Sequence, residues 1–272
     1  MFLKLPKNKI VKKESKMKKV ILAIMLMMGL LACGKKENAA TENKNAAGEE
    51  KVLRVGLNAV FAPFEYVENG EIKGFDIDLI NEIGKNLGYK IEIIDQSFDG
   101  LIPALKAGKI DLIISGMSAT EERKKSVDFT DEYFMSTQVY LRKKGNTQIN
   151  TVEDLNGKRI GVQLGTIQEN EAKTIKGAIV VPNESTVNII PDLNAGKVDS
   201  IILENIVALE YMKKNPELEI FLERKLDAGM AIAFDKGKHT ELVQKFNEEL
   251  KKMKESGKYE ELLNKYGLNT KK

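Results

Sequence analysis

The sequence predicts a two-lobed α/β protein in which one lobe is inserted into the other. Predicted strands and helices alternate along most of the chain. In addition, the stretch Ile102–Ile114 returns as Ile190–Ile202, with nine of thirteen residues identical at an offset of 88. Extended runs near residues 137 and 228 bracket one α/β unit inside another. Two crossings between lobes are typical of a clamshell that closes about a hinge.

The elements of the first lobe follow from their hydrophobic patterns. Short apolar runs rich in β-branched residues predict strands at 52–57, 89–94 and 110–114. Apolar residues at helical spacing predict helices at 76–87 and 98–106. Asn69-Gly70, within the segment 67–74, predicts a hairpin turn. The alternation of strands and helices predicts a mostly parallel sheet.

The same pattern restarts after a long predicted strand at 134–141. The further predicted elements are a short turn or helix at 151–157, strands at 159–164, 178–181, 198–203 and 218–222, and helices at 167–175, 185–194 and 206–214. An extended run at 229–234 and helices at 240–255 and 259–266 follow. We expect residues 51–137 and 228–272 to form lobe 1, and residues 138–227 to form lobe 2.

The first fifty residues indicate export. A basic segment, Lys16–Lys19, precedes thirteen apolar residues, which are too few for a stable transmembrane helix. The sequence Leu30-Leu31-Ala32-Cys33-Gly34 resembles a bacterial lipobox, in which the Cys is lipidated and becomes the mature N-terminus. We therefore expect residues 1–32 to be a signal peptide that starts at Met17, and residues 33–50 to be a disordered tether behind lipidated Cys33.

Composition argues against several function classes. Residues 1–33 contain eight of the 43 basic side chains and one of the 40 acidic ones, so the rest has a formal charge of −4 and no electrostatic support for binding nucleic acid. One His and one Cys leave no catalytic triad and no transition-metal cluster. Phosphate-binding glycine motifs of the Walker and G-x-G-x-x-G types are absent. We expect no catalytic residues, no metal and no cofactor.

Arg123 is the first candidate site residue. It follows the predicted strand 110–114, the small residues Ser115–Ser118 and Thr120, which is the predicted N-cap of a helix. Open α/β sheets bind ligands at the carboxyl ends of their strands, and arginine can hold a carboxylate with two parallel hydrogen bonds. The alternative is a solvated Arg beside two lysines. The segment Gly161–Thr166 is a weaker candidate anion site at a helix start, or an ordinary turn.

Several ordered motifs resemble the amino-acid-binding proteins of bacterial ABC importers, in the polar amino-acid group. The motifs, spread over residues 51–267, are Phe61-Ala62-Pro63-Phe64-Glu65, Gly74-Phe75-Asp76-Ile77-Asp78-Leu79, Phe98-Asp99-Gly100-Leu101, Ser115-Gly116-Met117-Ser118 with Thr120-Glu121-Glu122-Arg123, Asp128-Phe129-Thr130, Gly161-Val162-Gln163-Leu164-Gly165-Thr166, Val198-Asp199 and Gly257-Lys258-Tyr259. The resemblance implies a periplasmic-binding-protein-like clamshell. It also implies a receptor that captures a free L-amino acid and delivers it to permease subunits. We expect a monomer that is lipid-anchored outside the cytoplasmic membrane.

The resemblance assigns roles around the amino-acid backbone of the ligand. In such proteins the Arg of the S-x-x-S-x-T-x-x-R pattern, here Arg123, binds the α-carboxylate with backbone groups near Ser118 and Thr166. The α-ammonium is held by Ser118, by the carbonyl of Gly116 and by an acidic residue after the last strand of the inserted lobe. That residue is Glu204 here, where the family usually has Asp. The alternative for Glu204 is an acid placed at a helix N-terminus by the helix dipole.

The resemblance also places the ligand side chain. Phe61 and Phe98 match an aromatic pair that sandwiches it, with core packing as the alternative. Five polar residues are expected to complete the far end and the strand end, namely Asn58, Glu65, Asp76, Ser115 and Gln163. Asp76 has a second interpretation, as the cap of the helix that it begins.

The ligand class is less sharply specified. Relatives that bind basic amino acids often carry Asp in place of Asn58, whereas Ser136-Thr137-Gln138-Val139, Val162-Gln163 and the retained acids favour the arginine/lysine branch. We expect a basic amino acid, with a neutral polar one (glutamine or cystine-like) as the alternative. A second function class is a periplasmic dehydratase on the same fold, in which Glu204 would be a general acid.

Overall fold

The structure is a computed structural model that describes residues 51–269 of the 272-residue chain. The predicted signal peptide, Cys33 and the predicted tether lie outside the described residues. Within residues 51–269, every helix is too short or too polar to cross a membrane.

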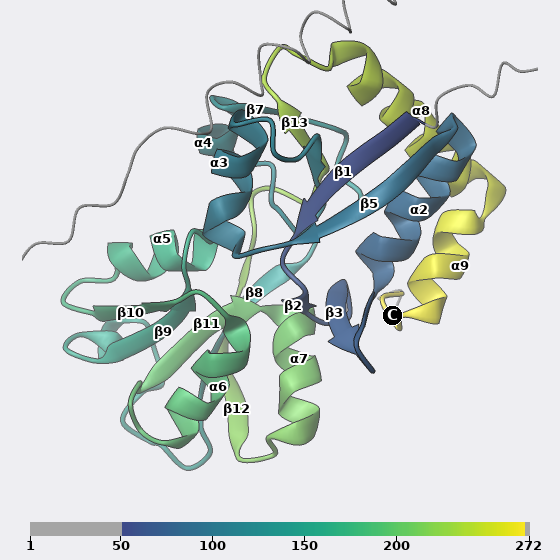
Figure 1. Ribbon diagram of the computed structural model, residues 1–272. Helices are drawn as coiled ribbons and strands as arrows, with labels where there is room; N and C mark the ends of the chain where they lie inside the picture. The colour runs from purple at the N-terminus through teal and green to yellow at the C-terminus, as the bar shows by residue number, and fades with distance from the viewer. Residues whose placement is uncertain (1–50, 270–272) are drawn as a thin grey trace, which may run out of the picture. The chain divides into compact units, whose positions relative to one another are not determined.

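The first lobe contains a five-stranded sheet with the order β5-β1-β6-β13-β7 (Figure 1). Its strands are β1 (Lys51–Leu57), β5 (Tyr89–Asp95), β6 (Leu112–Ile113), β7 (Val127–Phe129) and β13 (Ala233–Asp235). Its helices are α2 (Phe75–Leu87), α3 (Leu101–Lys106) after the 3₁₀ turn η1 (Phe98–Gly100), α4 (Glu121–Lys124), α8 (Thr240–Ser256) and α9 (Lys258–Lys265). One apolar cluster joins α2, α8 and α9 to the sheet, and a separate cluster joins α3 to it.

The second lobe contains another five-stranded sheet, with the order β10-β9-β11-β8-β12. Its strands are β8 (Thr137–Lys143), β9 (Arg159–Gln163), β10 (Ile179–Asn183), β11 (Ser200–Glu204) and β12 (Leu218–Lys225). Its helices are α5 (Ile167–Thr174), α6 (Thr186–Asn194) and α7 (Asn205–Lys214), with a 3₁₀ turn, η2 (Glu153–Leu155). The second sheet therefore contains five strands that are contiguous in sequence, whereas the first contains β1, β5, β6 and β7 and the returning strand β13.

A small third sheet follows β1. It consists of β2 (Val60–Phe61), β3 (Glu65–Glu68) and β4 (Glu71–Lys73). Asn69 and Gly70 have φ angles of 54° and 82° between β3 and β4, as a tight hairpin turn requires. The hairpin prediction is confirmed. Residues 58–66, whose aromatic-rich sequence predicts a loop, instead contain β2 and the start of β3.

The prediction of a mostly parallel sheet is wrong, because half of the strand pairs in each large sheet are antiparallel. In the first sheet β1 pairs in parallel with β5 and β6, whereas β13 pairs antiparallel with β6 and β7. The second sheet repeats this division, with β9 parallel to β10 and β11 and β8 antiparallel to β11 and β12. Strands β8 and β13 each arrive from the other lobe without an intervening helix, so no βαβ crossover forces them to be parallel.

Most predicted elements have the predicted type, with shifted ends. Thr120 caps α4 by accepting a hydrogen bond from the backbone N–H of Arg123 at 3.3 Å. The strand predicted at 134–141 begins only at Thr137, because Phe134 pairs instead with Met230 in an isolated bridge. This pairing joins the two crossings between the lobes, since the N–H of Met230 donates to the carbonyl of Phe134 at 2.7 Å.

The internal repeat extends to a partly exposed Arg–Asp pair in each lobe. The backbone N–H and guanidinium of Arg54 at β1 donate three hydrogen bonds of 2.7–3.0 Å to Asp111. Arg159 at β9 makes the same three bonds to Asp199, at 2.8–3.1 Å. The two Asp residues occupy identical positions of the sequence repeat. Each pair joins one strand, β1 or β9, to the residue directly before the neighbouring strand, β6 or β11.

Gly74 connects the hairpin to α2 at a φ of 137°, where an added Cβ would overlap the carbonyl oxygen of Phe64. We expect Gly74→Ala to lower the free energy of unfolding by about 3 kcal/mol or more, from strain plus steric overlap. Gly145→Ala is the matched control, since Gly145 also has a positive φ, 79°, but no heavy atom lies within 4 Å of its Cβ position. Urea denaturation of both variants compares the costs, and equal costs would contradict the predicted overlap.

Candidate functional site

A pocket between the two sheets gathers residues from both lobes. About 550 Å³ of space that no atom fills lies within it, part of it open to solvent at its mouth. Eleven of the twelve predicted ligand contacts line it, namely Asn58, Phe61, Glu65, Phe98, Ser115, Gly116, Ser118, Arg123, Gln163, Thr166 and Glu204. Asp76, the twelfth, lies behind the pocket wall. The roles of all twelve as ligand contacts stay predictions.

The Arg123 side chain lies in the pocket rather than in solvent. One guanidinium N–H group donates to the carbonyl of Ser118 at 3.0 Å, and another reaches across to the carbonyl of Gly165 in the second lobe at 3.1 Å. The guanidinium carbon lies 5.3 Å from the ring centre of Phe98. Desolvation lowers the pKa of Arg123 to about 10, so the group is still charged at neutral pH. Its other N–H donors are available to a ligand.

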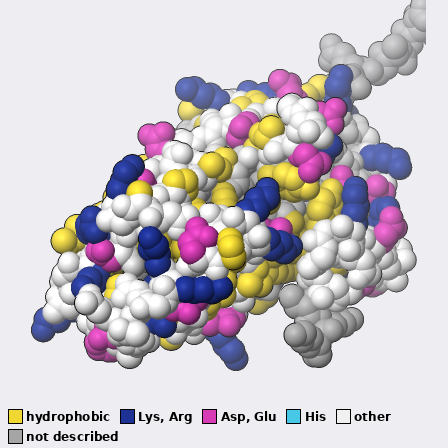
Figure 2. All heavy atoms as spheres, turned by 90° about the horizontal axis from the view of Figure 1, so that it is seen from below, with side chains coloured by type: hydrophobic (Ala, Val, Ile, Leu, Met, Phe, Trp, Pro, Cys, Tyr) yellow, Lys and Arg dark blue, Asp and Glu magenta, His cyan; other side chains and the backbone are white. Residues whose placement is uncertain are grey.

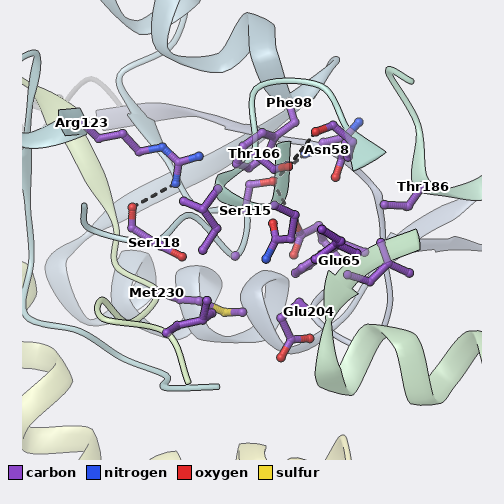
Figure 3. A pocket seen from close by; sticks show the side chains of 18 residues that line it. Asn58, Glu65, Phe98, Ser115, Ser118, Arg123, Thr166, Thr186, Glu204 and Met230 are labelled. Carbon is purple, nitrogen blue, oxygen red and sulfur yellow. Dashed lines mark hydrogen bonds between the residues drawn. The ribbon is translucent and has the colours of Figure 1, made fainter. Parts of the chain in front are cut away.

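Glu204 lies on the opposite side of the pocket from Arg123 (Figure 3). It ends β11 and caps α7, accepting a hydrogen bond from the N–H of Val207 at 2.9 Å. The Ser136 hydroxyl, in the crossing that leads to β8, donates to its other oxygen. Burial raises the pKa of the Glu204 carboxyl. The capping role is therefore real, and the carboxyl still faces the pocket.

Ser115 connects the end of β6 to a buried carboxyl pair. Its hydroxyl donates to Glu65 at 2.7 Å and accepts from the backbone N–H of Asn58 at 3.0 Å. Behind it, Asp76 accepts hydrogen bonds from the N–H of Gly116 at 3.0 Å and from the Tyr133 hydroxyl at 2.8 Å. The interpretation of Asp76 as a helix cap is wrong, since its side chain makes no capping bond and α2 is capped at Gly74.

The amides of Asn58 and Gln163 meet across the two lobes. Asn58 follows β1 and Gln163 ends β9, the corresponding strand of the second lobe. The Gln163 Nε2 donates to the Asn58 Oδ1 at 2.8 Å. Asn58 in turn donates to the carbonyl of Gln96 at 2.8 Å. The two amides therefore join the lobes at the base of the pocket.

The backbone of the Gly161–Thr166 turn is less available to an anion than the sequence suggests. Thr166 caps α5 through its hydroxyl, which accepts from the N–H of Glu169 at 3.2 Å. The Glu169 carboxylate in turn accepts from the N–H of Gly165 at 2.7 Å. Two N–H groups at this helix end, those of Gly165 and Glu169, are thus satisfied by residues of the same turn.

The two predicted aromatic contacts line the pocket and also pack against core residues. Phe61 lies 5.7 Å from Phe64, ring centre to ring centre, and covers Gly116 so closely that a Cβ there would lie 2.6 Å from its ring. Phe98 packs against the cluster around α3 and beneath the guanidinium of Arg123. Packing and pocket lining are therefore compatible for both rings.

Among the pocket residues that were not predicted are Thr186 and Met230, and Tyr211 lies next to Thr186. Thr186, at the start of α6, is fully buried, and its hydroxyl donates to the carbonyl of Val60 at 2.9 Å. The Tyr211 hydroxyl donates to the same carbonyl at 3.2 Å, and Met230 lines the pocket from the second crossing. Thr186 had one detectable signal, a hydroxyl residue at a predicted helix start. Tyr211 and Met230 depend on how the lobes meet, which no local pattern encodes.

The chemistry of the pocket suits binding. It holds one buried cation and buried carboxyl groups on separate walls, with aromatic rings between them. No group of three or more potential metal ligands occurs within residues 51–269. Figure 2 shows a face of the molecule on which basic and acidic side chains are interspersed, without the single-sign patch that a polyanion would need.

The buried pair Glu65 and Asp76 makes stability depend on pH. Burial and the neighbouring carboxyl raise the pKa of Glu65 well above its usual value, and burial raises the pKa of Asp76 to about 6. The folded protein therefore keeps a proton that the unfolded chain loses above about pH 4, and stability falls as pH rises toward the folded pKa values.

We expect Glu65→Gln to stabilise the protein relative to wild type at pH 8, by an amount of the order of 1 kcal/mol, and by less at pH 5. Urea denaturation at both pH values measures the difference. Glu68→Gln, at the exposed end of the same strand, is the control and should show no such pH-dependent gain. A gain for Glu65→Gln that is equal at both pH values would contradict the assignment of the retained proton.

Comparison with known proteins agrees with this geometry. The chain is 43% identical over 258 residues to a probable histidine-binding protein of Campylobacter jejuni, covering 93% of this chain and 100% of that one. It is 38% identical over 253 residues to the arginine-binding extracellular protein ArtP of Bacillus subtilis, covering 91% and 96%.

Solved structures show the same fold. An ancestral arginine-binding protein bound to arginine has a TM-score of 0.77 and 43% identity, covering 80% of this chain and 98% of that one. The substrate-binding protein AbpA of Streptococcus pneumoniae, bound to L-arginine, has a TM-score of 0.74 and 36% identity, covering 79% and 94%. The profile of the bacterial extracellular solute-binding proteins, family 3, matches residues 53–269. The chain therefore belongs to the bacterial extracellular solute-binding proteins, family 3.

Proposed function

We propose that this protein binds a free basic L-amino acid, with arginine as the first candidate, and delivers it to the permease of an ABC importer. The observation that carries the proposal is the Arg123 guanidinium, which is desolvated in the pocket and forms no salt bridge with any carboxylate of residues 51–269. A buried cation without a counter-ion is costly unless a ligand supplies an anion. Relatives named for arginine or histidine binding support this class of ligand.

The walls of the pocket suggest how an amino acid would lie. Its α-carboxylate would take two hydrogen bonds from Arg123, and its α-ammonium would lie toward Glu204, Ser118 and the carbonyl of Gly116. Its side chain would then extend between Phe61 and Phe98. A guanidinium or ammonium end is favoured by these aromatic faces.

The acid near the far end of the pocket favours a cationic side chain. Glu65 faces the pocket, is hydrogen-bonded to Ser115 and forms no salt bridge with a Lys or Arg in the described part of the chain. Asn58 and Gln163 beside it offer amide oxygens to the same group.

Glutamine is the second candidate ligand. A similar ancestral arginine-binding protein, 43% identical with a TM-score of 0.77, has been solved bound to glutamine. In the present chain Asn58 and Gln163 place two amides at the base of the pocket, and amides can pair with the amide of a neutral ligand as well. The carboxyl group of Glu65 is the feature that favours a cationic ligand over glutamine.

The bonds between the lobes support binding by closure. Arg123, Gln163 and Thr186 each connect one lobe to the other through a hydrogen bond at the pocket. A ligand that bridges Arg123 and Glu204 would add contacts available only when the lobes are together, which favours the closed state. We propose no catalytic step, because the family that matches the chain is one of solute-binding proteins.

We expect Arg123→Ala to weaken L-arginine binding at least about 100-fold, because two charge-assisted hydrogen bonds to the α-carboxylate are lost. Isothermal titration calorimetry of wild type with L-arginine, L-lysine, L-histidine and L-glutamine tests the ligand class first. Lys124→Ala is the control, since Lys124 is in the same helix but pairs with Glu121 on the surface. Near-native affinity in Arg123→Ala would show that the site is misplaced, and no binding of basic amino acids by wild type would refute the proposed function.

We also propose that Cys33 carries a lipid that holds the protein outside the cytoplasmic membrane, as its lipobox-like sequence suggests. We expect Cys33→Ser to move the protein from the membrane fraction to the soluble fraction of the producing cells, since a serine hydroxyl replaces the thiol that would carry the lipid. Fractionation followed by mass spectrometry of the N-terminus checks both the location and the modification. A Cys33→Ser variant that stays with the membrane would contradict lipid anchoring at this residue.

A further inference from the structure

Two buried carboxyl groups meet behind the wall of the pocket. Glu65 and Asp76 are both 0% exposed, and only Glu65 lines the pocket. One oxygen of each group has donors, the Ser115 hydroxyl for Glu65 and two groups, including the Tyr133 hydroxyl, for Asp76. The other oxygens, Glu65 Oε2 and Asp76 Oδ1, have no donor from the protein, and the donors from the adjacent residues Ser115 and Gly116 hold the two carboxyl groups near each other.

The groups around the pair favour a shared proton. Asp95 on β5 adds a further negative charge near Glu65, and Tyr133 and Tyr259 contribute neutral hydroxyls near Asp76. Neither carboxyl group forms a salt bridge with a Lys or Arg of residues 51–269. Two adjacent carboxylates in such surroundings repel each other, and a single proton between them removes most of that repulsion.

We propose that Asp76 shares one proton with Glu65, and that a cationic ligand side chain expels this proton into solvent when it binds. Asp76 is then a positioning residue, because it acts on the ligand only through Glu65. The inference rests on the proposed function, since it requires a ligand with a cationic side chain. It goes beyond that function because it makes the affinity depend on pH and on the charge of the ligand side chain.

The sign of the pH effect follows from the direction of proton movement. A proton released on binding competes with the ligand, so affinity for a cationic amino acid rises with pH while the free pair is still protonated. With one proton released, the affinity changes by up to about tenfold per pH unit. A neutral ligand such as glutamine leaves the proton in place, and the protonated carboxyl can donate a hydrogen bond to its amide oxygen. Low pH therefore shifts the preference toward the neutral ligand.

Calorimetry of L-arginine binding in buffers of different ionisation enthalpy counts the protons released per ligand. We expect Asp76→Asn to release about one proton fewer than wild type. The Asn side chain keeps the acceptor for Gly116 and Tyr133 and offers Glu65 an amide N–H that cannot dissociate. Any proton that Glu204 loses to the α-ammonium cancels, because both proteins contain Glu204. Asp78→Asn, in the same helix but paired with Lys265 and Tyr266, is the control and should release as many protons as wild type.

Equal proton release by wild type and Asp76→Asn would overturn the inference. If Asp76→Asn does not fold, Asp76→Ser gives the same comparison, since it also leaves Glu65 as the single carboxyl group of the pair. If wild type does not bind L-arginine, the proposed function fails instead. In that case the infrared band of a protonated carboxyl group still decides whether the pair shares a proton. The band of ligand-free wild type must then be larger by one carboxyl group than the band of Asp76→Asn, because a protonated Glu204 would contribute equally to both. Equal bands would refute the shared proton.

Discussion

Buried charge without a counter-ion is the constraint on which the pocket depends. Arg123 is held in a desolvated position by two backbone carbonyls and the ring of Phe98, with no carboxylate partner within the described chain. Glu204 faces it from the other lobe. Such an arrangement is stable enough to form because each group keeps some hydrogen bonds, but its charge remains uncompensated. A zwitterionic ligand supplies both missing charges at once, and this links recognition of the ligand to the position of the lobes.

The two lobes place these charges through one duplicated arrangement. In each lobe an Arg–Asp pair joins one strand, β1 or β9, to the residue directly before the neighbouring strand, as Arg54–Asp111 and Arg159–Asp199 do with the same three hydrogen bonds. The corresponding strand ends then carry different side chains. Asn58 corresponds to Gln163, and Gly116 corresponds to Glu204 by the offset of the repeat. The two lobes thus share the same Arg–Asp pairing but differ in the side chains at their strand ends. One wall of the pocket is therefore cationic and another is anionic.

Local sequence patterns predicted the elements and the strand-end residues, because hydrophobic periodicity and capping are short-range properties. Thr120 and the turn Asn69-Gly70 illustrate this, since each stands where its residue type is expected. Local patterns did not predict the half-antiparallel sheets or the contacts of Thr186 and Tyr211 with Val60, because these depend on how chain segments far apart in sequence meet. Asp76 shows the same limit, since its partners Gly116 and Tyr133 lie 40 and 57 residues away.

A crystal structure of the protein with L-arginine bound tests the central claim most directly, namely that opposed charges of the two lobes orient an amino acid. We expect the α-carboxylate within hydrogen-bond distance of Arg123, the α-ammonium beside Glu204, and the guanidinium between Phe61 and Phe98 at the end near Glu65. A ligand bound the other way round, with its α-carboxylate away from Arg123, would contradict the claim. So would a ligand bound outside the pocket.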